Sequence, residues 1–349
     1  MEKTEIDNQC TLDMNTQETR DKNWEKLGDK VAHNIMTRGL IFEFSTLPPL
    51  SADPPRNRKS HMSVVRKMVS DLIARGIVRQ EPVNTRVFYS HLFVVPKKEG
   101  KFRLIIDLKK MNKHVVRKTK EYLKIKEVTR TIMQPGWACK IDLQDAYYQV
   151  PIAQGFTKYL AFPLDGKTFT FQFLPFGLTT APWAFSRIIT PIKGYFHKKG
   201  VNFHSYLDDF IIICPSLDLL KVQIKLVQET LSDLGLKINL EKSVLIPTRE
   251  LEYLGIWVDC LHLRVSVTQK KKDLICRKIP EFLLKDRFSK RDLESLVGLM
   301  NFLAPCIHLG RMYLAPMQRF LSQIKTPNRD LLLFNPKELE APLSVWLDQ

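Results

Sequence analysis

Apolar residues that follow residue 60 recur at the spacing of an amphipathic helix. The residues that fall on one face of this helix are Val64, Val65, Met68, Leu72 and Ile73. Gly76 comes next, at a position where glycine commonly ends a helix. The pattern also predicts helices over residues 183–196 and 219–234, and a helical C-terminal part in which Ser289 caps a helix that Pro305 ends.

Shorter segments have the composition and alternation of strands. The predicted strands cover residues 89–96, 102–108, 138–143, 169–173, 201–206, 210–214 and 237–241, with a further hairpin over 251–267. Residues 97–100 connect the first pair as a hairpin with a basic tip. This order indicates an α+β fold, in which a mostly antiparallel sheet is followed by a helical C-terminal unit.

The charge is unevenly distributed along the chain. Lys and Arg total 54 and Asp and Glu total 37, which gives a net charge of +17. Residues 1–30 are acidic overall and lack apolar periodicity, so we expect a flexible polar tail over residues 1–35. The rest of the chain is strongly basic. A folded protein with this charge attracts a polyanion, usually nucleic acid. The alternative interpretation of the charge is a solvated basic surface without such a partner.

Composition excludes several classes of protein. Hydrophobic residues make up 44% and charged residues 26%, as in a globular protein. No apolar run approaches the ~20 residues of a membrane span, so we expect no membrane partner. The six cysteines are scattered without a CxxC pair, which disfavours a zinc site. Several of them lie in apolar runs, which is typical of reduced, buried thiols. We expect an intracellular protein, with nucleus and cytoplasm left unresolved.

Carboxylates at two strand ends carry the candidate chemistry. Asp142 ends one apolar strand, and Asp208 and Asp209 lie at the tip of an apolar hairpin. If these strands are neighbours, the carboxylates converge and must share protons or bind a hard cation. Two Mg²⁺ ions held in this way support nucleotidyl transfer. Asp is also common in turns, so each residue alone has a purely structural interpretation.

An ordered set of motifs around these carboxylates resembles the reverse transcriptases, over roughly residues 40–320. The motifs are Ser90-His91-Leu92-Phe93-Val94-Val95-Pro96-Lys97-Lys98, Phe102-Arg103-Leu104-Ile105-Ile106-Asp107-Leu108, Asp142-Leu143-Gln144-Asp145-Ala146-Tyr147, Leu174-Pro175-Phe176-Gly177-Leu178-Thr179-Thr180-Ala181-Pro182, Tyr206-Leu207-Asp208-Asp209, Gly235-Leu236-Lys237-Ile238-Asn239 and Tyr253-Leu254-Gly255. Within the family, residues 39–55 and a helix over residues 296–314 that ends at Gly310-Arg311 resemble retrotransposon enzymes of the DIRS-like (tyrosine-recombinase) elements.

The resemblance implies a right-hand polymerase with fingers, a palm built on an antiparallel sheet, and a helical thumb. It places the N-terminal extension and fingers at residues 36–135 and the palm at 136–260, with a fingers insertion near 155–180. The thumb would cover residues 261–325, and a connection would begin at 326–349. We see no later acidic constellation for ribonuclease H, so that activity is expected from sequence outside this chain or from another protein.

The resemblance also assigns a role to each matched residue. Asp142, Asp208 and Asp209 would be catalytic metal ligands, joined by the backbone carbonyl of Leu143, with Mg²⁺ as the ion and Mn²⁺ as an alternative. The residues implied to bind the deoxynucleoside triphosphate are Lys97, Arg103, Tyr147, Phe176, Gly177 and Lys242. Tyr147 would exclude a 2′-hydroxyl, and Lys242 would be a general acid at the leaving pyrophosphate. Tyr253-Leu254-Gly255 would grip the primer.

The sequence therefore predicts an RNA-directed DNA polymerase that acts on a primed RNA or DNA template. A second interpretation is a catalytically silent, host-adopted protein that keeps the fold and binds nucleic acid. A third is a structural module without triphosphate binding.

Overall fold

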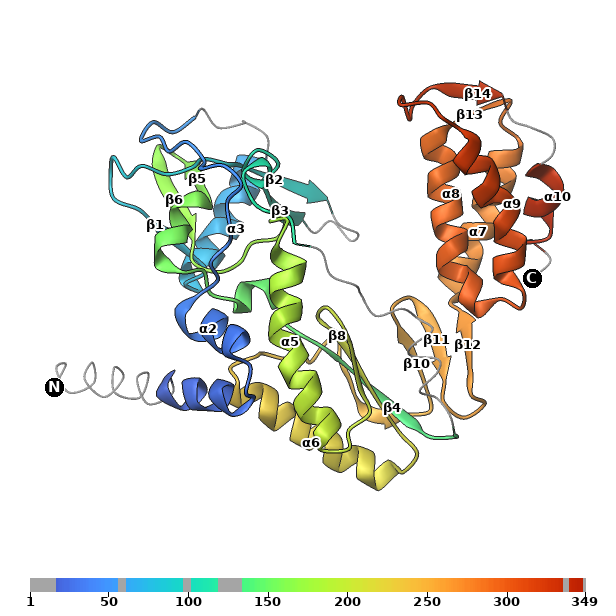
Figure 1. Ribbon diagram of the computed structural model, residues 1–349, viewed down its shortest axis with the longest axis horizontal. Coiled ribbons are helices and arrows are strands. Elements are labelled where there is room, and N and C mark those ends of the chain that lie inside the picture. Colours follow the sequence, from blue (N-terminus) through green and yellow to red (C-terminus); the bar gives the residue numbers. More distant parts are fainter. Residues whose placement is uncertain (1–16, 56–60, 97–101, 119–133, 335–338, 348–349) are drawn as a thin grey trace. The chain divides into compact units, whose positions relative to one another are not determined.

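The computed structural model describes residues 17–55, 61–96, 102–118, 134–334 and 339–347 (Figure 1). The chain divides into two compact units. Unit 1 holds the described residues of Met1–Tyr122, Ile141–Phe210 and Val222–Ser243, and unit 2 holds those of Leu123–Lys140, Ile211–Lys221 and Val244–Gln349. The boundaries predicted for fingers, palm and thumb stay a prediction.

Helices and strands alternate in the order expected for an α+β protein. The helices are α2 (Lys30–Arg38), α3 (Met62–Ala74), η2 (Met111–Lys113), η3 (Ala146–Gln149), η4 (Gln154–Tyr159), α5 (Ala181–Lys198), α6 (Leu217–Asp233), α7 (Gln269–Leu283), α8 (Lys290–Leu303), η5 (Ala304–Cys306), α9 (Gly310–Gln323) and α10 (Glu340–Ser344). The strands are β1 (Val78–Gln80), β2 (His91–Pro96), β3 (Phe102–Asp107), β4 (Trp137–Asp142), β5 (Ala161–Leu164), β6 (Lys167–Phe171), β7 (Phe203–Tyr206), β8 (Asp209–Cys214), β9 (Val244–Thr248), β10 (Glu250–Tyr253), β11 (Ile256–Asp259), β12 (Arg264–Val267), β13 (Arg287–Ser289) and β14 (Leu332–Phe334).

The N-terminal segment differs from the predicted flexible tail. Residues 17–26 are helical, and α2 follows with Asp29 as its N-cap. Trp24 is buried and donates from Nε1 to the carbonyl of Leu234 at 3.0 Å. Asp29 also pairs with Arg187 of α5 at 3.1 Å. The buried Trp24 and the ion pair between Asp29 and Arg187 therefore attach residues 17–35 to the rest of unit 1, although the segment is polar overall. Residues 1–16 of the predicted tail lie outside the described residues.

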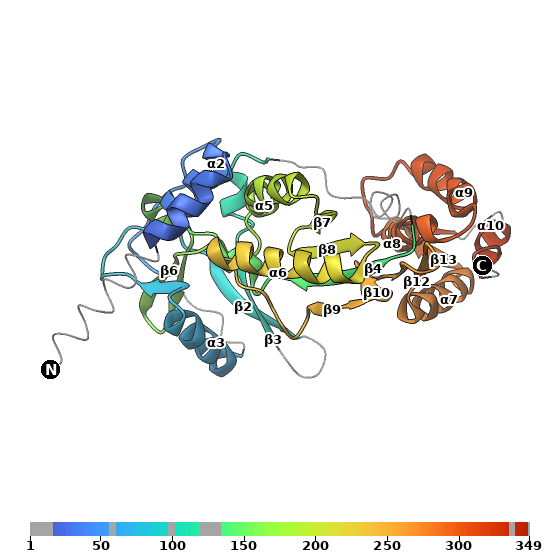
Figure 2. The same cartoon turned by 90° about the horizontal axis from the view of Figure 1, so that it is seen from below.

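An antiparallel sheet with strand order β7-β8-β4-β9 carries the acidic motifs. α5 packs beside β7, and Figure 2 shows this helix along the sheet. Phe196 of α5 lies 4.9 Å from Phe203 of β7, and Phe203 lies 5.0 Å from Phe210 of β8, measured between ring centroids. This aromatic core fixes the hairpin that ends in Asp208.

The basic-tipped hairpin also forms. β2 and β3 pair antiparallel from His91 opposite Asp107 to Pro96 opposite Phe102. Its predicted turn at residues 97–100 lies outside the described residues. A second sheet of unit 1 has the strand order β1-β6-β5.

The strand predicted over residues 237–241 is reduced to an isolated bridge between Ile238 and Leu143. Asn239 causes the difference, because its side-chain oxygen accepts from the amide of Lys242 at 3.2 Å and its carbonyl from the amide of Ser243. These bonds turn the chain, as Asn commonly does. The regular strand, β9, begins at Val244.

Unit 2 contains a three-stranded sheet and a helical group. Residues 251–267, predicted as one hairpin, lie in the antiparallel sheet β10-β11-β12. The Ser289 cap is confirmed as a capping box with Asp292 at the start of α8. The single helix predicted over residues 296–314 is wrong, because α8 ends at Leu303 and Gly310 begins α9. Pro305 lies in η5 between them and removes a backbone donor.

Within the described residues, every helix is too short or too polar to cross a membrane. Three cysteines, Cys139, Cys214 and Cys260, are buried as free thiols, and burial raises the pKa of Cys139 to about 12. Cys276 is exposed, and Cys306 is half-buried.

Candidate nucleotidyl-transfer site

The turn between β7 and β8 presents the first carboxylate. Leu207 and Asp208 form its two-residue loop, and Leu207 has a φ of +51°. Two-residue hairpin loops need a positive φ because only the mirror-image turns match the twist of the strands. Leucine rarely adopts this conformation, so the tip carries local backbone strain, a feature that clusters at functional sites.

Asp142, at the end of β4, lies beside this turn. The backbone amide of Leu143 donates to the carbonyl of Asp208 at 3.1 Å. The Asp142 amide donates to Ser243 Oγ at 3.0 Å, and the Ser243 hydroxyl donates to the Asn239 carbonyl at 2.6 Å. The structure thus brings together Asp142, Asp208 and Asp209 from two strands, within unit 1.

The electrostatics reflect a crowded acidic site. Burial raises the pKa of Asp208, and the charges of Asp209 and Asp142 raise it further, whereas its own backbone and Lys242 act in the opposite direction. Lys242 Nζ lies 3.8 Å from Asp142 Oδ1, and the Lys242 side chain is 68% exposed. A single solvated lysine therefore offsets only part of the negative charge.

The donor set has the chemistry that Mg²⁺ requires. Hard, small cations bind carboxylate oxygens together with substrate phosphates. A short main-chain ladder of two hydrogen bonds flanks Leu143. The carbonyl of Asp142 accepts from the amide of Asn239 at 2.8 Å, and the amide of Gln144 donates to the carbonyl of Lys237 at 2.9 Å. Among the described residues this ladder leaves the Leu143 carbonyl available as a further oxygen donor.

Tyr147 and Phe176 lie together next to the acidic strand. Their ring centroids are 4.8 Å apart, and Tyr147 also contacts buried Phe185 edge-on at 5.6 Å. Phe176 is 43% exposed. These contacts would fix the Tyr147 ring in one position, as a steric gate requires.

Asn112 is a supporting residue that the sequence analysis missed. Its side chain donates to the Gly177 carbonyl at 2.8 Å and accepts from the Thr179 amide at 2.8 Å. Gly177 has a φ of +104°, which favours glycine. These two bonds link η2 to the loop that follows β6. A single Asn after a strand forms no sequence motif from which such a contact could be predicted.

The remaining predicted residues fall in separate places. Arg103 is exposed on β3, opposite Val95 of β2. Lys97 lies outside the described residues. Tyr253, Leu254 and Gly255 belong to unit 2, where buried Tyr253 packs with Ile211 and Val258, and Leu254 and Gly255 form a tight turn with φ values of +51° and +75°.

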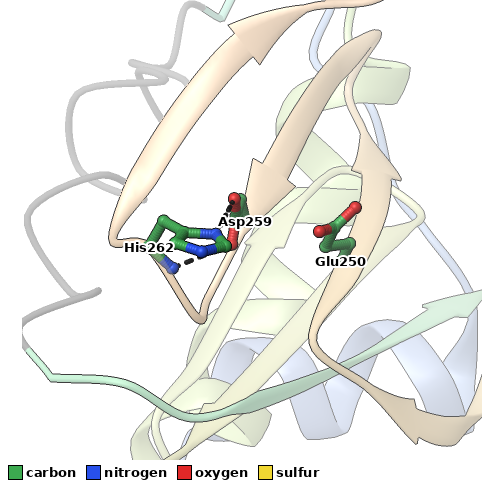
Figure 3. A group of neighbouring side chains, drawn as sticks. All are labelled: Glu250, Asp259 and His262. Atoms are coloured by element: carbon green, nitrogen blue, oxygen red, sulfur yellow. Dashed lines mark hydrogen bonds and ion pairs between the residues drawn. The ribbon is translucent and has the colours of Figure 1, made fainter.

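A second group of potential metal ligands consists of Glu250, Asp259 and His262 in unit 2 (Figure 3). Asp259 already accepts from the amides of Leu261 and His262 and from the His262 ring, at 2.8–3.0 Å. Arg264 donates to it as well, at 3.1 Å. These donors lower the pKa of Asp259 to about 2, the His262 amide most of all. The group is a saturated turn network that stabilises the link between β11 and β12.

Comparison with known proteins shows which family the region around the site resembles. Residues 95–258, just under half of the chain, match the family model for reverse transcriptase (RNA-dependent DNA polymerase). This match spans all three carboxylates. Residues 95–258 are therefore similar to a reverse transcriptase domain.

Relatives of this domain come from retrotransposons and retroviruses. The retrovirus-related Pol polyprotein from transposon opus of Drosophila melanogaster is 30% identical over 55% of this chain and 19% of its own length. The Pro-Pol polyprotein of Simian foamy virus type 1 is 25% identical over 80% of this chain and 23% of its own length. The chain thus spans about a fifth of these relatives.

The polymerase fold extends beyond the matched residues. The foamy viral protease-reverse transcriptase, solved in complex with double-stranded DNA, has a TM-score of 0.70 with 19% identity and covers 90% of this chain and 51% of that one. At this identity the likeness shows the fold, and it agrees with the predicted α+β polymerase architecture.

Proposed function

We propose that this chain is an RNA-directed DNA polymerase, which adds deoxynucleotides to a primer 3′-hydroxyl opposite an RNA or DNA template. The observation that carries the proposal is the hydrogen bond from Leu143 to Asp208, which places Asp142 beside the Asp208-Asp209 turn inside a reverse transcriptase domain. The solved relatives bound to double-stranded DNA and to an RNA/DNA hybrid support the choice of partner.

In the reaction, a bond forms between the primer 3′-oxygen and the α-phosphorus, and the bond from that phosphorus to pyrophosphate breaks. The 3′-hydroxyl would release its proton to water, and Lys242 would donate a proton to the pyrophosphate oxygen. Arg103 would hold the triphosphate, because a guanidinium matches phosphate oxygens with two parallel donors. Tyr147 would block a ribose 2′-hydroxyl by contact.

Asp142, Asp208, Asp209 and the Leu143 carbonyl would hold the divalent ions, for which we propose two Mg²⁺. When bound, such ions lower the pKa of the attacking hydroxyl and neutralise charge on the leaving phosphates. The protein's own contribution is to keep the carboxylates close together and partly desolvated.

Primer extension with Mg²⁺ on RNA and DNA templates tests the proposal. We expect Asp208→Asn to reduce synthesis at least ~10³-fold, since a ligand charge is lost where charge develops. The matched control is Asp218→Asn on α6, a side chain that is 92% exposed and pairs only with a neighbouring lysine among the described residues. Near-normal synthesis by Asp208→Asn would refute the assignment.

The same experiment separates the alternatives. A catalytically silent protein would bind the primed template without extending it, in wild type and variant alike. A structural module would bind neither template nor triphosphate. The three catalytic carboxylates are all present and close together, which favours the enzyme.

We also propose the DIRS-like subfamily on the residues at 39–55 and 296–314, although the latter form two helices. A tyrosine recombinase encoded next to this chain in its genome would support the assignment, and an unrelated integrase there would oppose it. Template removal is assigned to a ribonuclease H outside this chain, and cleavage of an RNA/DNA hybrid by the chain itself would overturn that point.

A further inference from the structure

Gln149 connects two segments that are 88 residues apart in the sequence. Its side-chain oxygen accepts from the Lys237 amide at 2.7 Å. Its side-chain nitrogen donates to the Lys237 carbonyl at 3.1 Å and to the Gln144 carbonyl. One amide thus satisfies both main-chain groups of Lys237, as a neighbouring strand would do.

The segments joined in this way flank the metal ligands. Residues 142–144 and 237–239 share a single isolated bridge, with one main-chain hydrogen bond on each side of it. Such a short ladder is weak by itself, because each hydrogen bond contributes only ~1 kcal/mol net. Gln149 adds three bonds at the end of the ladder and so fixes the backbone that follows Asp142.

Arg75 restrains the same turn from the other side. Its Nη2 lies 2.7 Å from Asp145 Oδ2, and a longer contact of 3.4 Å joins Arg75 to Asp71. Asp145 has a φ of +45°, a conformation that a non-glycine residue keeps only under restraint. The ion pair with Arg75 supplies such a restraint two residues after Leu143.

Apolar packing accounts for only part of the position of this turn, since Leu143 and Ala146 are buried but the residues between them are not. Arg75, Gln144, Asp145, Gln149 and Lys237 all line a cavity of about 670 Å³ within unit 1. Gln144 and Asp145 are exposed. On the side that faces the cavity, polar contacts therefore restrain Gln144 and Asp145.

We propose that Gln149, assisted by Arg75, is a positioning residue that sets the Asp142–Leu143 backbone for divalent-ion binding. This inference rests on the proposed function. In this role the side chain would not contact substrate or ion. It acts through the Gln144 and Lys237 backbone, in the way that outer hydrogen bonds orient metal ligands.

The first test variant is Gln149→Met, which keeps the length and removes every side-chain hydrogen bond of Gln149. The second is Arg75→Gln, which removes the ion pairs of Arg75 with Asp145 and Asp71. The control is Gln154→Ala, an exposed glutamine that lines the same cavity and has no side-chain hydrogen bond among the described residues. The first readout is Mn²⁺ binding to the full chain by electron paramagnetic resonance, without nucleotide or template. The second is the Mg²⁺ concentration that gives half-maximal primer extension.

We expect Gln149→Met to weaken Mn²⁺ binding by ~10–100-fold, and to raise the half-maximal Mg²⁺ concentration by a similar factor. Arg75→Gln should shift both in the same direction by less, and Gln154→Ala should match wild type. A purely structural role would lower the folded fraction and the maximal rate, yet leave the ion affinity of the folded protein unchanged. Unaltered Mn²⁺ affinity in folded Gln149→Met, or in Arg75→Gln if the former does not fold, overturns the inference.

Failure of the proposed function has a different signature. It would appear as wild-type protein that binds Mn²⁺ but does not extend a primer. In that case, the Mn²⁺ affinities of wild type and Gln149→Met still test whether Gln149 is a positioning residue.

Discussion

The ring of Tyr147 rests against the ring of Phe176, with their centroids 4.8 Å apart and their planes inclined by 54°. Phe176 is partly exposed and precedes Gly177, whose backbone adopts a φ of +104°. The contact ties a residue just after β4 to the loop after β6. A change in either ring would therefore alter the floor of the proposed nucleotide site.

Tyr147→Val should admit ribonucleotides, because the smaller side chain leaves space for a 2′-hydroxyl. We expect discrimination between deoxy- and ribonucleoside triphosphates to fall by about 10–100-fold, the range that a steric pocket commonly supplies. Single-nucleotide insertion kinetics measure the ratio. Tyr148→Phe, which removes only a hydroxyl from the next residue, is the control. Unchanged sugar selectivity in Tyr147→Val would reject the gate.

Asn112→Ala should loosen the loop that contains Gly177, since it deletes both a donor and an acceptor. The unfolding free energy should fall by about 1–3 kcal/mol, because the Gly177 carbonyl and the Thr179 amide lose their partner. The apparent KM for the triphosphate should rise in parallel. Asn112→Asp keeps the acceptor for Thr179 and loses the donor, so an intermediate effect is expected. Denaturant unfolding and steady-state kinetics test both, and full stability in Asn112→Ala would contradict the contact.

Asp208 should make the protein less stable as pH rises. Its pKa is raised in the folded state, so the folded protein binds the proton more tightly than the unfolded chain, and this stabilisation is lost as pH rises through the folded value. Asp208→Asn should therefore raise the unfolding temperature at pH 7 without metal, by on the order of 2 °C, and should have little effect near pH 3.

Thermal unfolding across pH checks this expectation, with Asp218→Asn as the exposed control. Addition of Mg²⁺ should stabilise wild type and leave Asp208→Asn nearly unaffected, because the ion requires the carboxylate form. An Asp208→Asn variant less stable than wild type at pH 7 without metal would oppose the electrostatic account.

Trp24→Ala should destabilise unit 1, although the residue lies in a segment that is polar overall. Trp24 is 2% exposed and donates to the Leu234 carbonyl, so its loss should cost about 3–5 kcal/mol. Lys22→Ala, an exposed position of the same helical segment, is the control. Equal unfolding midpoints for the two variants would show that residues 17–26 contribute nothing to the fold.

The sequence predicted the features that local pattern determines. Asp142 ends one apolar strand and Asp208 follows another, so their proximity was predicted on the condition that the strands are neighbours, and the sheet order β7-β8-β4-β9 meets this condition. The cap at Ser289 was equally readable, because a capping box needs residues only three positions apart. The roles of the individual site residues stay predictions.

Contacts between distant segments were beyond sequence reasoning. Trp24 meets Leu234 across 210 residues, and Gln149 meets Lys237 across 88. Neither residue belongs to an apolar period or a turn motif that would mark it. Asn239 is a residue whose effect could have been recognised in the sequence, because Asn is a common turn former. Its turn reduces the strand that the alternating pattern predicted to one bridge.

The left-handed leucine at the tip of the β7–β8 hairpin has a consequence for how the protein would bind its proposed ligands. A residue kept at a φ of +51° against its preference occupies a narrow energy well, so the peptide that carries Asp208 has few alternative orientations. The orientation of the Asp208 carboxylate is therefore set when the chain folds. Under the proposed function, ions and nucleotides would bind to a carboxylate that is already in position, and their binding energy would not be used to arrange it.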